Sequence, residues 1–180
     1  MKYLENIKET LGKLSLKKNL SNNKRYVKVH NFNSSETIGI LFNSPDEEAF
    51  NVVKNFLSFL ASNNLKVIAL GYVPDKKIPE KLLLRKGINF FCKNDLNWYY
   101  KPKNEVIEQF INHNFDILID LSLKEYFPLY YIGSLSNASF KIGRQSEKYQ
   151  YQDLMINIGK NHSVEYLVDQ IKHYLTIINQ

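Results

Sequence analysis

The chain has 180 residues, of which 44% are hydrophobic and 23% are charged, a composition typical of one globular domain. Its single cysteine excludes an internal disulfide framework and favours a reducing compartment. No apolar run approaches the roughly 18 residues that cross a bilayer. The first residues also lack the pattern of a signal peptide, so the sequence predicts a soluble cytoplasmic protein.

The net charge of +6 is concentrated near the N-terminus. Residues 1–33 contain eight of the 24 lysines and arginines but two of the 18 aspartates and glutamates, so residues 34–180 carry 16 of each sign and are neutral. This asymmetry indicates a polyanionic partner for the N-terminal region. The sequence therefore predicts two regions, a basic N-terminal helix and arm at 1–33 and a single Rossmann-like α/β domain at 34–180.

Residues 3–19 are predicted to form an amphipathic helix, because apolar side chains recur at steps of three and four residues. The apolar stripe consists of Leu4, Ile7, Leu11 and Leu14. Two roles are open for this helix: it docks its leucines on the domain and leaves its lysines in solvent, or it carries the lysines to a partner. The polar and basic stretch 21–33 is expected to be an extended connector or an edge strand.

The rest of the chain alternates short apolar runs with amphipathic segments. Strands are expected at residues 37–42, 66–73, 88–91, 117–120, 140–142 and 153–158. Helices are expected from 44 to 63, at 79–86, from 102, at 127–135 and from 163. Ser44 is expected to cap the first of these helices, with Pro45 in the first helical position and Glu47 completing a capping box. Six strands that alternate with helices predict a doubly wound, mostly parallel sheet in the order 3-2-1-4-5-6.

In such a sheet, ligands bind outside the carboxyl ends of the strands, at the switch point where the strand order reverses. The candidate residues there are Asn43, Ser44, Asp120, Ser122 and Arg144. Asp120 could act as a base or hold a sugar hydroxyl, or it could cap the loop that follows its strand. Arg144 could bind an anionic ligand or pair with a carboxylate such as that of Glu147.

Several function classes are disfavoured by what the sequence lacks. It contains no G-x-G-x-x-G or Walker motif, and Asp46, Glu47 and Glu48 already occupy the positive end of the helix dipole where a phosphate would bind. Its four histidines are scattered without metal-ligand spacing, and Ser122 has no nucleophile-elbow pattern around it. We therefore expect a non-catalytic protein with no cofactor and no metal site.

Basic and aromatic residues outside the switch point are the candidates for partner binding. They are Lys13, Lys17, Lys18, Lys24, Arg25, Lys28, Trp98, Tyr99 and Tyr100. The three aromatic residues lie among lysines in the loop 93–103, where they could stack on bases, anchor a protein, or only cover the end of the sheet. RNA or a ribosomal particle is the expected partner, an acidic protein is the alternative, and an anionic membrane surface is a third candidate.

Five segments carry a resemblance to known proteins. They are HNF (His30–Phe32), TIGILF (Thr37–Phe42), KNDLNWYYKP (Lys93–Pro102), FDILIDLSL (Phe115–Leu123) and DLMINI (Asp153–Ile158). Over nearly the whole chain, these segments resemble a family of short uncharacterised proteins of Bacteroidota. The segment 115–144 is also similar, more remotely, to a strand–helix–strand unit in the N-terminal Rossmann-like domain of heptosyltransferase-type (GT-B) glycosyltransferases, although their glycine-rich turn is missing here. This second resemblance implies an alternative function, a sugar or sugar-nucleotide binding protein or enzyme derived from half of such a transferase.

Overall fold

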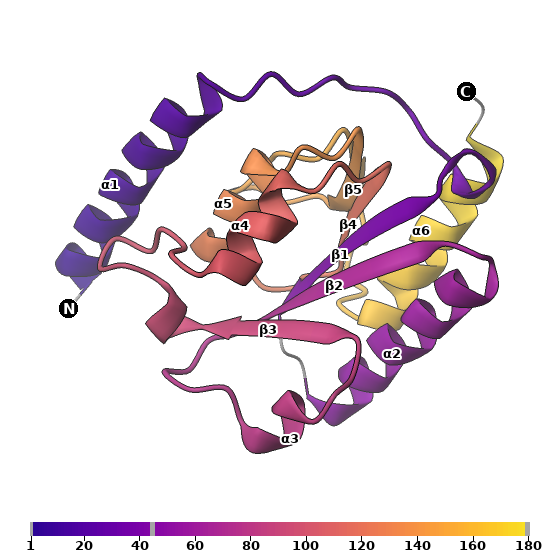
Figure 1. Cartoon of the computed structure of the whole chain (residues 1–180), viewed down its shortest axis with the longest axis horizontal. Coiled ribbons are helices and arrows are strands. Elements are labelled where there is room, and N and C mark those ends of the chain that lie inside the picture. The colour runs from indigo at the N-terminus through magenta and orange to yellow at the C-terminus, as the bar shows by residue number, and fades with distance from the viewer. Residues whose placement is uncertain (1, 44–45, 179–180) are drawn as a thin grey trace.

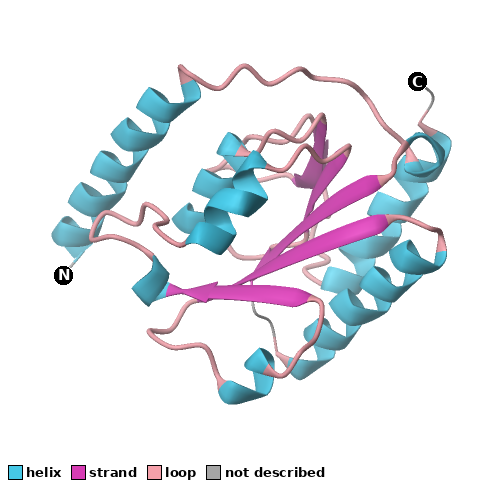
Figure 2. Ribbon diagram, viewed as in Figure 1, coloured by secondary structure: helices cyan, strands magenta, loops and turns pink. Residues whose placement is uncertain are grey.

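The computed structural model describes residues 2–43 and 46–178. Its centre is a sheet of six parallel strands with helices on both faces (Figures 1 and 2). The strands are β1 (Thr37–Asn43), β2 (Lys66–Val73), β3 (Ile88–Cys92), β4 (Ile117–Asp120), β5 (Phe140–Arg144) and β6 (Leu154–Ile156). The helices are α1 (Lys2–Leu20), α2 (Glu47–Ser62), α3 (Glu80–Leu83), α4 (Glu105–Asn112), α5 (Phe127–Leu135) and α6 (Val164–Ile177), with 3-10 turns at Phe32–Ser34 and Lys93–Asp95. Within the described ranges, no helix combines the length and hydropathy that crossing a membrane requires.

The strand order is β3-β2-β1-β4-β5-β6, and each neighbouring pair is parallel. The doubly wound order predicted from the sequence is therefore confirmed. All residues of β1 from Ile38 to Phe42 are buried, because helices cover both faces of the sheet at its centre. The chain order reverses between β1 and β4, where Leu41 and Asp120 are register partners. The carboxyl ends of these two strands form the switch point.

Three hydrophobic clusters join the helices to the sheet and to one another. α2 and α6 pack together on one face, where Phe56 and Leu167 are fully buried. α4 and α5 cover the opposite face, to which they contribute Ile107 and Ile132. The third cluster joins α1 to the outer surface of α5, so two layers of helix lie over this face (Figure 1).

The start of α2 differs from the predicted cap. Asp46 is the N-cap residue, and its carboxylate accepts a hydrogen bond from Ala49 N at 2.9 Å. The predicted Ser44 cap is therefore wrong, while Ser44 and Pro45 themselves lie outside the described residues. Glu47 pairs with Arg85 at 2.9 Å. A carboxylate interacts with the positive end of the helix dipole as well as with its free N–H groups, which favours Asp46 as the cap.

α1 docks on α5, but not through the face that its leucines define. The members of the predicted stripe that remain in solvent are Leu4 at 64%, Ile7 at 52% and Leu14 at 60% exposure. The buried face contains Gly12 and Leu16. A Cβ at Gly12 would lie 2.5 Å from the Phe127 ring and 2.7 Å from the Tyr99 carbonyl oxygen, so the absence of a side chain allows this close contact.

The stretch 21–33 is an extended connector and not an edge strand. It leaves the C-terminal end of α1 and crosses to the end of α6, where Asn31 Nδ2 donates to Ile178 O at 3.1 Å (Figure 1). Along this path Lys28 N donates to Ser139 O at 3.1 Å, without a ladder of further backbone bonds to β5. The path carries the connector past the amino ends of β5 and β4 before β1 begins.

Candidate functional site

Three of the residues predicted at the switch point gather at the carboxyl edge of the sheet. Asp120 ends β4, Ser122 follows it, and Arg144 ends β5. Arg144 Nε lies 3.5 Å from Ser122 O, and all three residues line one small cavity. Asn43 ends β1 without lining this cavity, and Ser44 lies outside the described residues.

Asp120 is buried, and both of its carboxylate oxygens accept hydrogen bonds. Oδ1 accepts from Ser122 N at 2.9 Å, which caps the loop after β4, and Oδ2 accepts from Tyr151 OH at 2.6 Å. Burial raises the pKa of the Asp120 carboxyl, although these hydrogen bonds oppose the change. Arg144 donates to the carbonyls of Ser122 and Gln145. The switch point is thus a polar network closed by the protein's own side chains.

The connection between β5 and β6 covers this network. The Tyr149 ring stacks on Tyr130 with 4.7 Å between centroids. Ser146 Oγ donates to the carboxylate of Glu125, in the loop after β4, at 2.5 Å. The cavity beneath holds about 30 Å³, room for one water molecule, whereas sites for small organic ligands typically span about 300–1,000 Å³. Ser122 Oγ is buried there without a hydrogen-bond partner among the described residues. A sugar nucleotide could reach the switch point only if this connection moved.

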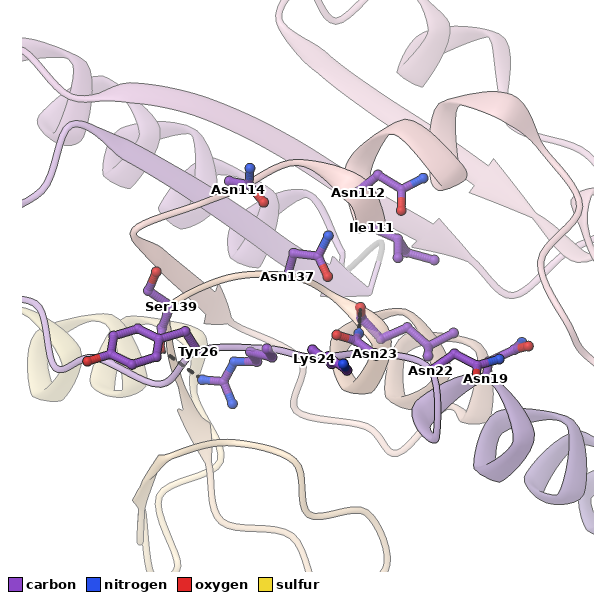
Figure 3. Close-up of a pocket in the computed structure, with 12 residues that line it drawn as sticks. Asn19, Asn22, Asn23, Lys24, Tyr26, Ile111, Asn112, Asn114, Asn137 and Ser139 are labelled. Atoms are coloured by element: carbon purple, nitrogen blue, oxygen red, sulfur yellow. Dashed lines mark hydrogen bonds between the residues drawn. The ribbon is translucent and has the colours of Figure 1, made fainter.

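A larger hollow lies at the opposite edge of the sheet, beside the amino ends of β4 and β5 (Figure 3). We call it the amide groove, because six asparagines line it and none of its described lining residues is acidic. Its volume is about 650 Å³. One wall is the segment 19–26, and the other is formed by the loops 111–114 and 135–139. The asparagines are Asn19, Asn22, Asn23, Asn112, Asn114 and Asn137.

Two of these asparagines hold the groove in shape, and four present free amides to it. Asn19 Nδ2 donates to Tyr131 OH and Asn23 Nδ2 donates to Leu135 O, both at 2.6 Å. The amides that make no hydrogen bond within the described part of the chain are those of Asn22, Asn112, Asn114 and Asn137. Each free amide offers two donors and an acceptor, so the groove can bind a polar ligand that carries both kinds of group.

Four lysines of the segment 17–28, which we call the basic segment, project into solvent beside the groove. They are Lys17, Lys18, Lys24 and Lys28. None of them forms an ion pair with a described residue, and Lys24 lines the groove itself. Lys13, also predicted to bind a partner, is paired with Glu9 at 2.9 Å. The four lysines of the basic segment that form no ion pair with a described residue therefore lie beside the groove.

Arg25, the fifth cation of the basic segment, clamps that segment to the domain. Its Nε donates to Ala138 O at 2.5 Å and its Nη2 to Ser139 O at 3.0 Å. Its Nη1 and Nη2 also bind the Asp153 carboxylate. These contacts fix the backbone of the segment at its middle, so that the neighbouring lysines point outward from a held chain.

Arg25→Ala is expected to lower the free energy of unfolding by about 2 kcal/mol, because it removes charge-assisted hydrogen bonds and leaves Asp153 without its cation. Urea unfolding followed by circular dichroism measures the change. The control is Lys24→Ala, which removes the adjacent exposed cation and should change stability by no more than about 0.5 kcal/mol. Equal losses in the two variants would contradict the clamp.

The aromatic loop around Trp98 does not join the amide groove. Tyr99 O faces Gly12, and Lys8 Nζ lies 6.0 Å from the centre of the Tyr100 ring, so the loop packs on the N-terminal half of α1. Trp98 remains 62% exposed. The groove lies at the other end of α1, so the predicted partner-binding residues fall on two separate surfaces (Figure 1).

Sequence reasoning missed the residues that shape both edges of the sheet. Tyr151, which fills the switch point, comes from a loop whose local pattern carries no sign of that contact. The asparagines of the groove were also missed, and their only signal is the grouping at 22–23 and 112–114, which has no periodicity. Among the described residues, no group of three histidine, cysteine, aspartate or glutamate side chains is arranged to hold a metal ion.

Comparison with known proteins places the chain in a family. A protein-family model, described as a family of unknown function (DUF6913), matches residues 8–178. No curated protein and no solved structure matches the chain. The resemblances to Bacteroidota proteins and to glycosyltransferases stay predictions, since none of these findings bears on them. Because the family match covers almost all of its length, this chain belongs to the DUF6913 family.

Proposed function

We propose that this protein binds RNA through the basic segment. The observation that carries the proposal is that Lys17, Lys18, Lys24 and Lys28 face solvent within one short stretch and pair with no described carboxylate. Lysines that neutralise phosphates release condensed counterions, and this release drives nucleic-acid binding. A ribosomal particle would present the same phosphates to the segment.

The surroundings of the basic segment support the same function. Arg25 and the Lys28 backbone anchor the segment, so its backbone needs little ordering when the lysines meet a ligand. The groove beside them contributes no acidic side chain from its described lining. Because residues 34–180 are neutral, the field of the whole protein also draws a polyanion to this end.

Fluorescence anisotropy with a labelled single-stranded RNA oligonucleotide of mixed sequence, titrated at several KCl concentrations, tests the proposal. The fourfold variant K17E/K18E/K24E/K28E is expected to bind about tenfold more weakly or worse. Its affinity should also depend less steeply on salt, by about 0.7 in the log–log slope for each phosphate that a lysine no longer neutralises. The matched control is K54E/K66E/K86E/K160E, which changes the charge equally at exposed lysines elsewhere and should retain the slope.

Two results would contradict RNA binding by this segment. One is the absence of binding to RNA at low salt, and the other is an equal loss of affinity in the control variant. Co-sedimentation with phosphatidylserine vesicles, and binding to a polyglutamate peptide, separate the remaining candidates. Retention on either of these probes without affinity for RNA would assign the lysines to an anionic membrane surface or to an acidic protein.

A further inference from the structure

We infer that the amide groove receives unpaired bases of single-stranded RNA, so that the protein selects single strands over duplexes. This inference rests on the proposed RNA binding and adds a second surface to it. The lysines of the basic segment would bind phosphates, which carry no sequence information, whereas the groove would bind the bases.

The chemistry of the groove matches base edges better than phosphates. Its free amides stand on both walls, with Asn112, Asn114 and Asn137 on the wall across from the segment that carries Asn22 (Figure 3). Base edges present donors and acceptors side by side, and an asparagine amide pairs with such an edge through two hydrogen bonds, as with adenine. A phosphate only accepts hydrogen bonds, so it can pair with the N–H groups of an amide but not with the amide oxygen.

An exposed aromatic ring adds a stacking surface to these amides. Tyr26 lines the groove with 80% of its surface exposed, and it lies beside Ser139 at one end of the groove (Figure 3). Such rings stack on unpaired bases of any type. Lys24 precedes it by two residues in the chain and Lys28 follows two residues later, so phosphates on either side of a stacked base would meet a cation.

The shape of the groove explains the preference for single strands. Its volume of about 650 Å³ is within the range of sites that enclose small organic groups, and it lies between the clamped basic segment and the loops of the domain. In duplex RNA the bases are stacked and paired, and their edges are presented only in a wide, shallow minor groove or a deep, narrow major groove. Unpaired bases can turn out of the strand and enter.

The inference is tested with the full-length protein and one labelled RNA, used as a single strand and annealed into a blunt duplex. The wild type is expected to prefer the single strand about tenfold, the range expected for stacking of a base. N112A/N114A/N137A and, separately, Y26A should lose most of this preference while they keep the salt dependence of binding. The matched control N51A/N55A/N89A removes three exposed amides elsewhere and should behave as wild type.

The outcomes separate this inference from the proposed function. If neither RNA form binds, the proposed function fails and the inference fails with it. If both forms bind equally well with the expected salt dependence, or if both groove variants keep the wild-type preference, RNA binding stands and the inference is overturned. Displacement of the single strand by a neutral oligosaccharide would also overturn it, because it would assign the groove to a glycan.

Discussion

Gly133→Ala is expected to destabilise the protein by about 3 kcal/mol, although alanine forms helices better than glycine does. Gly133 lies in α5, and a Cβ there would overlap the ring of Tyr151. Tyr151 would have to move, which breaks its 2.6 Å hydrogen bond to Asp120 and leaves a buried carboxyl with one donor fewer. The overlap and the broken hydrogen bond together outweigh the ~1 kcal/mol that alanine contributes to the helix.

A double-mutant cycle identifies the cause of this loss. Tyr151→Ala removes the ring, so Gly133→Ala introduced into that background should be neutral or should stabilise by up to about 1 kcal/mol. Urea unfolding of the four proteins measures the coupling. If Gly133→Ala costs as much without Tyr151 as with it, the packing of this tyrosine against α5 does not explain the effect.

Lys141→Met is expected to stabilise the protein by about 2 kcal/mol at pH 6, an unusual result for the loss of a hydrogen-bonded side chain. Lys141 lies in β5 with 2% of its surface exposed, and its Nζ donates to Ser134 O at 3.0 Å. Burial, and then the nearby charge of Arg25, lower the pKa of the Lys141 ammonium from 10.5 to about 7. A change of this size corresponds to at most about 5 kcal/mol, and the bond that methionine cannot make to Ser134 offsets part of it.

The dependence on pH distinguishes this cause from a simple gain in packing. Between pH 7 and pH 10 the unfolded chain keeps the Lys141 proton while the folded protein releases it, so the stability of the wild type should rise with pH across this window. Below pH 7 both states are protonated, and the full cost of the buried charge remains. Lys141→Met should lack this rise when unfolding is measured at pH 6, 8 and 9.5. Parallel pH profiles of the two proteins would show that Lys141 does not carry a lowered pKa.

The sheet could be predicted because the residue patterns that specify its strands and helices are local. The apolar run of β1 and the matching run of β4 are typical of strands covered on both faces, and the helices between strands are long enough to require parallel crossovers. The start of α2 was predicted less well, since Ser44 and Asp46 both have the chemistry of a cap and stand two residues apart. The neighbouring sequence does not indicate which of the two residues caps the helix.

α1 shows where a periodic pattern stops being informative. Its leucine spacing predicted a helix, and the helix is present. Docking of the leucines on the domain was one of two roles that the pattern left open, and the face that docks is the one with Gly12, which meets Phe127 and the Tyr99 backbone. An apolar stripe shows which face of a helix is hydrophobic, but the face that packs depends on the shape of the partner helix.

The candidate sites were predictable to different degrees. Asp120, Ser122 and Arg144 were placed together correctly, because strand order alone brings the carboxyl ends of β4 and β5 to the same edge. That Tyr151 fills this edge could not be predicted, since the contact joins two residues 31 positions apart without any repeating pattern. The amide groove was missed for the same reason, because it combines three separate segments.

The sequence by itself determined that this chain forms a doubly wound sheet and that its excess positive charge lies at the N-terminus, because hydrophobic periodicity, crossover length and charge are properties of neighbouring residues. Only the tertiary structure decided that Tyr151 fills the switch point and that a hollow lined by asparagines lies at the amino edge, between the basic segment and two loops. Those features depend on how side chains from distant segments fit together in space. Which side chains meet is decided by the packing of the whole chain, and no local pattern of residues specifies that packing.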